Sequence, residues 1–122
     1  MTYLPRILLI DDEKDFLFLS TSLLRKHGFD VYSMCSTDEV LPTVQRFGPK
    51  IIIIDVRLAK YDGRMLCRQL KKQANTNGVK VLLHSTLSDL EKEYDKYGAA
   101  EFLLKPYSMD FLVSRISYHL EN

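Results

Sequence analysis

Short runs of apolar residues alternate along this chain with longer segments whose apolar residues recur every three or four positions. The short runs have the length of β-strands and lie at residues 6–10, 29–34, 51–55, 79–85 and 101–105. The longer segments have helical spacing and lie at residues 16–28, 36–48, 63–73, 88–98 and 108–120. Most of the short runs are apolar throughout, which is typical of parallel strands buried on both faces. The pattern therefore predicts five repeats of a strand followed by a helix.

Residues with known preferences at helix ends support these segments. Gly28 lies where the first helix is expected to stop. Ser36 and Glu39 have the spacing of a capping box at the start of the second helix, although Pro42 should kink or delay that helix. Ser108 is placed to cap the last helix. The fourth helix is highly charged, as expected for a solvated helix face.

The alternation of strands and helices predicts the class of fold. Helices that link parallel strands provide right-handed crossovers, so we expect a doubly wound α/β sheet with helices on both faces. The chain has 122 residues, and no internal repeat or linker is visible. We therefore expect one domain over residues 1–122.

Composition excludes several classes of protein. The net charge is +1, so no overall field attracts nucleic acid or a membrane surface. No apolar run is long enough to span a bilayer, and no signal-peptide cleavage site follows the first strand. Cys35 and Cys67 match no metal-binding spacing and are expected to be free thiols. These features favour a cytoplasmic protein.

Polar residues stand at the ends of four predicted strands, where ligands bind in an open parallel sheet. They are Asp11, Asp12 and Glu13 after the first strand, Asp55 after the third, Ser85 and Thr86 after the fourth, and Lys105 and Pro106 after the fifth. Clustered carboxylates need a cation to remain ionised, and a site made only of oxygen ligands favours Mg²⁺. A carboxylate held beside Mg²⁺ and a lysine can itself accept a phosphoryl group. We therefore interpret Asp55, at the end of an isoleucine-rich strand, as a phosphoacceptor.

The sequence resembles the response-regulator receiver domains of two-component signalling over nearly its whole length. The resemblance is carried by "LLIDDE", "IIIIDVRLAKYDG", "VLLHST" and "GAAEFLLKP", in the family's order and spacing. It implies a flavodoxin-like, five-stranded parallel sheet in the order 2-1-3-4-5. The pattern is specific because an acidic pair, a lone aspartate, a hydroxyl residue and a Lys-Pro pair occur at four successive strand ends.

The resemblance also implies a role for each matching residue. Asp55 is the phosphoacceptor, Asp12 is a direct Mg²⁺ ligand, Asp11 holds the ion through water, and the Arg57 carbonyl is a further ligand. Lys105 pairs with the phosphoryl group. Ser85 binds a phosphoryl oxygen and draws its loop inward, and Phe102 matches an aromatic residue that rotates in the switch.

Three departures from the family pattern affect switching more than the pocket. Leu58 and Ala59 replace the usual Met-Pro, Arg57 places a bulky cation beside the site, and the stretch after Ser85 is shorter by about two residues. The fourth helix is therefore expected to be reshaped.

Simpler roles remain open for several of these residues. Asp11 and Asp12 also suit a helix N-terminus, and Ser85 suits the cap of the fourth helix. Lys105 alone would be a solvated surface charge, Phe102 also suits the core, and His84 is expected to be a satisfied strand-end histidine.

Three functions are consistent with these residues. The first is a receiver that takes phosphate from a histidine kinase or phosphotransfer protein and controls a downstream protein or output domain. Its output face would comprise residues 88–98, 101–105 and 108–120. The second is a receiver-like binding module that works without phosphorylation, and the third is a small Mg²⁺-dependent phosphohydrolase, disfavoured because no cap would enclose a substrate. We expect no enzyme beyond self-phosphorylation and autodephosphorylation, no direct nucleic-acid or membrane partner, and possible homodimerisation.

Overall fold

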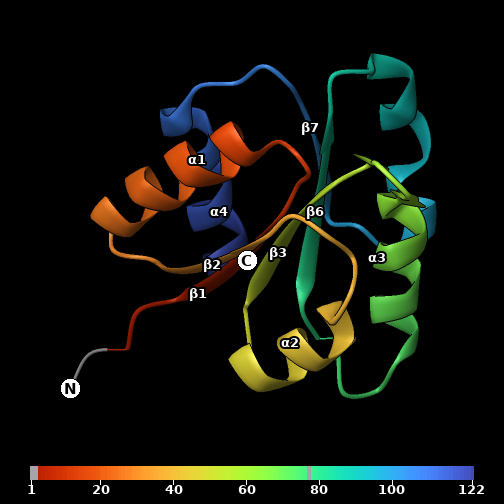
Figure 1. Ribbon diagram of the computed structural model, residues 1–122, viewed down its shortest axis with the longest axis horizontal. Helices are drawn as coiled ribbons and strands as arrows, with labels where there is room; N and C mark the ends of the chain where they lie inside the picture. The colour runs from red at the N-terminus through yellow and green to blue at the C-terminus, as the bar shows by residue number, and fades with distance from the viewer. Residues whose placement is uncertain (1–2, 77) are drawn as a thin grey trace.

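A central parallel sheet organises the structure, a computed structural model that describes residues 3–76 and 78–122 (Figure 1). Its strands are β1 (Arg6–Ile10), β2 (Asp30–Met34), β3 (Ile51–Asp55), β6 (Lys80–Ser85) and β7 (Glu101–Leu104). They lie in the order β2-β1-β3-β6-β7, and every neighbouring pair is parallel. Numbered among themselves, these five strands have the expected order 2-1-3-4-5, so the fold prediction is confirmed.

Helices cover both faces of the sheet. On one face of the sheet lie α1 (Lys14–Lys26) and α4 (Met109–Glu121), as Figure 1 shows. Their apolar residues pack on Ile7, Leu9 and Ile53. On the other face α2 (Val40–Phe47), α3 (Gly63–Lys72) and η1 (Ser88–Tyr97) pack on the alternate strand residues. The two cores explain why the central strands are apolar at every position: each successive side chain faces a different helical layer.

The start of the second helix differs from its prediction. Helix α2 begins at Val40, not at Ser36, because Glu39 adopts a left-handed conformation with φ of 67° that interrupts the helix. The Ser36 hydroxyl instead accepts a hydrogen bond from the backbone N–H of Asp38. The prediction of a capping box was therefore wrong. The later start of the helix places Pro42 in its first turn, where the missing N–H breaks no hydrogen bond. Gly28 and Ser108 do mark helix ends as predicted.

Two further segments depart from regular structure. The reshaped fourth helix is confirmed: η1 is a 3₁₀ helix, and Glu93 interrupts it with non-helical backbone angles. The loop after Asp55 contains a short antiparallel pair that the sequence did not predict, β4 (Arg57–Leu58) with β5 (Tyr61–Asp62). Both segments flank the carboxyl ends of β3 and β6.

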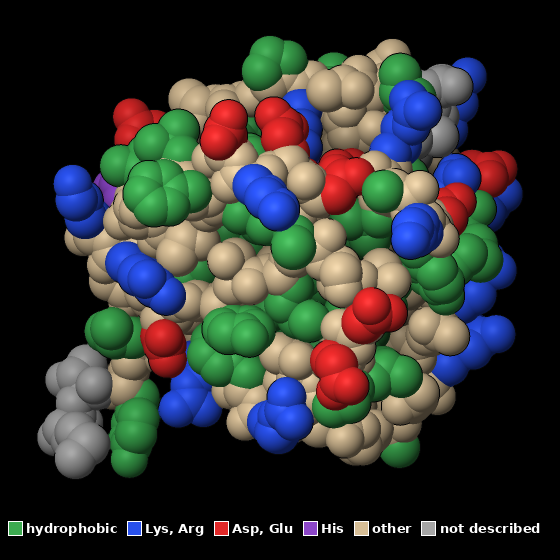
Figure 2. Space-filling view, in the orientation of Figure 1, with side chains coloured by type: hydrophobic (Ala, Val, Ile, Leu, Met, Phe, Trp, Pro, Cys, Tyr) green, Lys and Arg blue, Asp and Glu red, His purple; other side chains and the backbone are tan. Residues whose placement is uncertain are grey.

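The surface carries no dominant charge on the face shown in Figure 2, where acidic, basic and hydrophobic side chains are interspersed. This distribution agrees with the net charge of +1. In the described part of the chain, every helix is too short or too polar to cross a bilayer.

Candidate acidic site

Three polar side chains lie in a row across the carboxyl ends of adjacent strands. Asp11 follows β1, Asp55 ends β3, and His84 pairs with Asp55 in the register of β3 and β6. All three point to the α1–α4 face, because side chains alternate along each strand. One ligand atom from each lies within 4.8 Å of the others. The sheet therefore gathers residues that are far apart in sequence into one polar cluster.

Asp55, the predicted phosphoacceptor, is held on rigid backbone. Its Oδ1 accepts a hydrogen bond of 3.0 Å from the backbone N–H of Arg57. Burial raises the pKa of Asp55 to about 6, with added contributions from the negative charges of Asp11 and Asp12. The Arg57 hydrogen bond and the nearby Lys105 charge oppose this rise but do not cancel it. Asp55 is thus an unusually basic carboxylate.

A close approach of two backbones fixes the end of β3. A Cβ added at Gly63 would lie 2.1 Å from the carbonyl oxygen of Asp55, so only glycine fits at this first residue of α3. The Gly63 N–H donates to the Val56 carbonyl, and the Asp62 side chain caps the helix by accepting from the Arg64 N–H. The sequence Asp62-Gly63 therefore packs the start of α3 directly against the backbone of the predicted phosphoacceptor.

Asp11 is fully buried and its oxygens already have donors. Oδ1 accepts from the Glu13 N–H at 2.8 Å, and Oδ2 accepts from Lys105 Nζ at 2.9 Å. Burial acts most strongly on Asp11 and by itself would raise its pKa, but the bonds from His84, Lys105 and Glu13 together lower the pKa to about 2. Asp11 is therefore the permanent anion of the cluster.

Lys105 is the cation of the cluster. Its Nζ lies 3.8 Å from Asp55 Oδ2 and 3.7 Å from Glu13 Oε2, in addition to its bond with Asp11. The ammonium also lies over the ring of Phe16, 4.8 Å from the centroid. This placement, with only 10% of the side chain exposed, excludes the simpler role of a solvated surface lysine.

The other predicted site residues lie around this cluster and differ in their exposure and contacts. Asp12 is exposed and influences Asp55 through its charge. Ser85 is buried, and its hydroxyl accepts a hydrogen bond of 3.2 Å from the Leu87 N–H, which ties it to the loop before η1. Phe102 is already buried in the core beside Leu83. The ring therefore has an inward position in this structure, and its rotation in the switch stays a prediction.

The sequence analysis assigned no function to His84 or Tyr107, which are part of the same cluster. His84 is fully buried, with Nε2 2.8 Å from Asp11 Oδ2 and Nδ1 2.7 Å from the Tyr107 hydroxyl. Burial lowers the pKa of His84 and thereby favours the neutral ring, although the neighbouring Asp11 opposes this shift. The prediction of a satisfied histidine holds at Nδ1 only, because Nε2 has no well-aligned hydrogen-bond partner among the described residues. The alternation of side chains along β6 was the signal that placed His84 on the face of Asp55.

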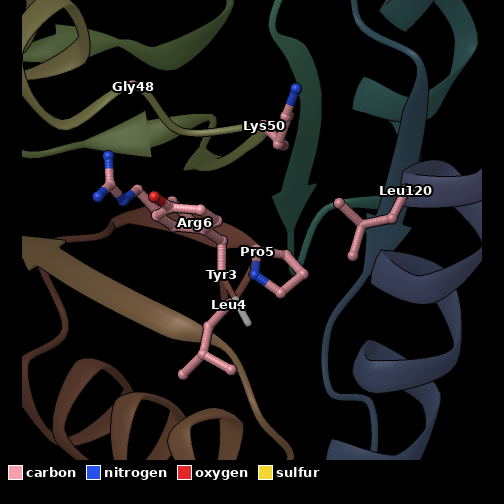
Figure 3. Close-up of a pocket in the computed structure, with 7 residues that line it drawn as sticks. All are labelled: Tyr3, Leu4, Pro5, Arg6, Gly48, Lys50 and Leu120. Atoms are coloured by element: carbon pink, nitrogen blue, oxygen red, sulfur yellow. The ribbon is translucent and has the colours of Figure 1, made fainter. Parts of the chain in front are cut away.

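A separate hollow lies at the opposite end of the sheet, where β1 and β3 begin (Figure 3). Its volume is about 530 Å³, and its lining residues are Tyr3, Leu4, Pro5, Arg6, Gly48, Lys50 and Leu120. Arg6 is already engaged there, by the Phe47 carbonyl and the Asp30 carboxylate. The residues that line this hollow include no carboxylate, whereas Asp11 and Asp55 lie at the acidic end.

The acidic end has the donor chemistry that Mg²⁺ requires. Asp11, Asp12 and Asp55 provide carboxylate oxygens, the preferred ligands of this hard cation. The pKa of Asp55 is raised mainly by burial, with the charges of Asp11 and Asp12 adding to the rise, and a bound cation would stabilise the ionised form against both. The residues present therefore fit a magnesium site.

A parallel sheet in this order, with two aspartates and a lysine at its carboxyl edge, defines the class of receiver domains. The family described as "Response regulator receiver domain" matches residues 7–117, and this chain belongs to it. The family is a signalling module of two-component systems, and its members generally bind Mg²⁺ at an acidic pocket.

Curated relatives share this region. The chain is 30% identical to the "Probable transcriptional regulator ycf27" of Porphyridium aerugineum over 113 residues, covering 91% of this chain and 46% of the relative. It is 27% identical to the "DNA-binding dual master transcriptional regulator RpaA" of Synechocystis, covering 93% and 48%. The chain thus spans about half the length of the curated relatives it matches.

Solved structures confirm the fold. The BeF₃-activated receiver domain of Klebsiella pneumoniae RstA has a TM-score of 0.86 and 25% identity, with 96% of this chain and 99% of that chain covered. The BeF₃-activated DrrB receiver domain has a TM-score of 0.85 and 23% identity, with 98% and 100% covered.

Proposed function

We propose that this chain is a phospho-accepting receiver domain in which Asp55 takes a phosphoryl group from a histidine kinase or phosphotransfer protein. The observation that carries the proposal is the position of Lys105, whose Nζ lies 2.9 Å from Asp11 and 3.8 Å from Asp55. A fixed ammonium beside a buried carboxylate on rigid backbone is the arrangement that phosphoryl transfer to that carboxylate requires.

The residues divide the chemistry among them. With a pKa of about 6, Asp55 is mostly ionised at neutral pH and is more nucleophilic than an ordinary carboxylate. Its oxygen forms the new bond to phosphorus as the bond to the donor nitrogen breaks, and Lys105 balances the charge on the transferred oxygens. Asp11, Asp12, Asp55 and the Arg57 carbonyl would hold Mg²⁺, which supplies further charge neutralisation when bound. Slow hydrolysis of the acyl phosphate would return Asp55 to its starting state.

Output would begin at Ser85. A phosphoryl oxygen on Asp55 would accept a hydrogen bond from the Ser85 hydroxyl, and because that hydroxyl also accepts from the Leu87 N–H, its movement would draw the loop before η1 toward the pocket. The affected face comprises η1, β7 and α4, where Leu104, Phe111 and Tyr118 are exposed hydrophobic residues. A downstream protein, an output domain or a second copy of the chain would bind there.

The prediction of no nucleic-acid partner is not supported by the comparisons, because RpaA is named as a DNA-binding regulator. Since this chain spans about half of that relative, control of DNA binding through a further domain is part of the proposal. The proposal does not include recognition of DNA by the residues described above.

Exposure to a small acyl-phosphate donor, with and without Mg²⁺, tests the proposal by intact mass. We expect one phosphate adduct that requires Mg²⁺ and is absent in Asp55→Asn. Asp38→Asn, a matched change at an exposed aspartate, should retain the adduct. An adduct that persists in Asp55→Asn would refute the assignment.

The absence of any adduct would favour the second function, a phosphorylation-independent binding module. In the structure Phe102 is buried in the core, and Leu104, Phe111 and Tyr118 are exposed on the η1–β7–α4 face. A partner could then bind the η1–β7–α4 face in its present state.

A further inference from the structure

A buried chain of polar contacts runs from the acidic site to the start of α4. The Tyr107 hydroxyl lies 2.7 Å from His84 Nδ1, and His84 Nε2 lies 2.8 Å from Asp11 Oδ2. Tyr107 follows Lys105 and Pro106 and directly precedes Ser108, the N-cap of α4. The chain therefore connects Asp11 to the residue that precedes α4 through side chains, in addition to the backbone link through Lys105 and Pro106.

The direction of each contact follows from the groups involved. A carboxylate only accepts, so Nε2 carries the hydrogen toward Asp11; a neutral ring then accepts at Nδ1, and the Tyr107 hydroxyl donates. Nε2 is too poorly aligned with Asp11 for a hydrogen bond of good geometry, but the 2.8 Å separation holds the N–H in close electrostatic contact with the carboxylate. One tautomer is thus selected by a partner on each side of the ring.

Aromatic packing restricts the ring further. Phe16 of α1 makes edge contacts with His84 at 5.2 Å and with Tyr107 at 6.3 Å between ring centroids. Tyr107 also lies 6.0 Å from the exposed ring of Phe111 on α4. A change in the orientation of Asp11 would therefore reach Phe111 through buried side chains.

We propose that His84 is a positioning residue for Asp11, and that Tyr107, by fixing the ring of His84, couples occupancy of the acidic site to the start of α4. This inference rests on the proposed Mg²⁺ site and gives it a second route of output, independent of Ser85. Lys105 Nζ and His84 Nε2 lie 2.9 Å and 2.8 Å from Oδ2, and the Glu13 N–H donates to Oδ1, so His84 is one of three groups that orient the Asp11 carboxylate.

Mg²⁺ titration by NMR tests the inference in wild type, His84→Leu, His84→Gln and Tyr107→Phe. Amide signals of Asp12 and Arg57 give the affinity, the Phe111 amide reports α4, and ring ¹⁵N signals report the His84 tautomer. His27→Gln and Tyr32→Phe are controls, since both side chains are exposed and distant in sequence from the chain of contacts.

We expect the Nε2–H tautomer in wild type and a loss of Mg²⁺ affinity on the order of tenfold in His84→Leu and Tyr107→Phe. The Mg²⁺ response of Phe111 should disappear in both variants. His84→Gln should retain most of the affinity, because its amide N–H can replace Nε2–H; a loss as large as that of His84→Leu would overturn the inference.

Unchanged affinity and a persistent Phe111 response in Tyr107→Phe would also overturn it, and this variant decides the matter if His84→Leu does not fold. If the wild type shows no Mg²⁺ response at Asp12 or Arg57, the proposed Mg²⁺ site fails and the inference fails with it. A wild-type response that the variants leave intact overturns the inference alone.

Discussion

At the scale of single residues, Asp55 and Asp11 are two carboxylates with opposite environments. Asp55 is raised to a pKa of about 6 mainly by burial, whereas Asp11 is lowered to about 2 by its donors. The folded protein therefore favours a proton on Asp55 and disfavours one on Asp11. Such pairs of groups with divergent pKa values are typical of sites that bind cations or perform chemistry.

The Asp55→Asn variant should be more stable than wild type at neutral pH without metal. The pKa of Asp55 is about 6 in the folded protein, above its ordinary value of 3.8, which applies to the unfolded chain. The stabilisation of the folded state by this shift is fully present below pH 3.8 and is lost as the pH rises through about 6. The shift from 3.8 to about 6 corresponds to an upper limit of about 3 kcal/mol. Asn stays neutral and can keep the bond from the Arg57 N–H, so it avoids this loss.

Urea unfolding in EDTA at pH 4, 5, 6 and 7 measures the effect. We expect a difference between Asp55→Asn and wild type near zero at pH 4 that grows to about 1–3 kcal/mol at pH 7. Asp38→Asn should show no such growth. A pH-independent difference would mean that the charge of Asp55 is not the cause.

Several site residues were predictable because a strand end is a strong local signal. Asp11, Asp55 and Lys105 each directly follow or end an apolar run, and parallel topology brings such ends together. The contacts of His84 were not predictable. Its partners are 73 and 23 positions away in the sequence, and the contacts also depend on side-chain orientation. Whether Asp12 and the Arg57 carbonyl bind metal stays a prediction.

At the scale of elements, the lengths of the apolar runs predicted the five strands of the main sheet. Where the other elements differ from their predictions, local backbone conformation is the reason. The capping box at Ser36 failed because Glu39 is left-handed, a state that its residue type does not favour. The strands β4 and β5 have two residues each and are too short to show the alternating apolar pattern of a strand. Tyr94 and Tyr97 of η1 pack against a core cluster that includes residues of α3 and β7, and no local sequence pattern contains these contacts.

Gly63→Ala should disturb the junction of β3 and α3. The new methyl group would lie 2.1 Å from the Asp55 carbonyl oxygen and 2.8 Å from an Ile54 methyl carbon, so backbone must move. We expect destabilisation of about 2–3 kcal/mol and weaker Mg²⁺ binding, because the displaced backbone carries Asp55. Chemical denaturation and Mg²⁺ titration measure the two effects.

Gly78→Ala is the matched control, since a Cβ there meets nothing within 4 Å. It should leave both stability and Mg²⁺ affinity near wild type. If Gly63→Ala loses stability but binds Mg²⁺ normally, the junction supports the fold without positioning the site.

At the scale of the whole molecule, the acidic site and the proposed output face share β6 and β7. Asp11 and Asp55 lie on the α1–α4 side, whereas Ser85 leads to η1 on the other side. The Lys105 N–H donates to the Ser85 carbonyl at 2.8 Å, so the two strand ends are tied together. A ligand bound to Lys105 and Ser85 would therefore act on both helical layers.

Binding of a phosphoryl mimic with Mg²⁺ should thus change NMR signals well beyond the pocket, including residues 86–104. Ser85→Ala removes the hydroxyl that the proposed loop movement needs, so its signals in this range should shift much less while Asp55 remains competent for the mimic. A preference of only a few kcal/mol for one loop position is enough to shift such a two-state population. Ser22→Ala, at an exposed position of α1, should behave as wild type. Wild-type shifts confined to the residues around Asp55 would contradict this coupling and favour the phosphorylation-independent module.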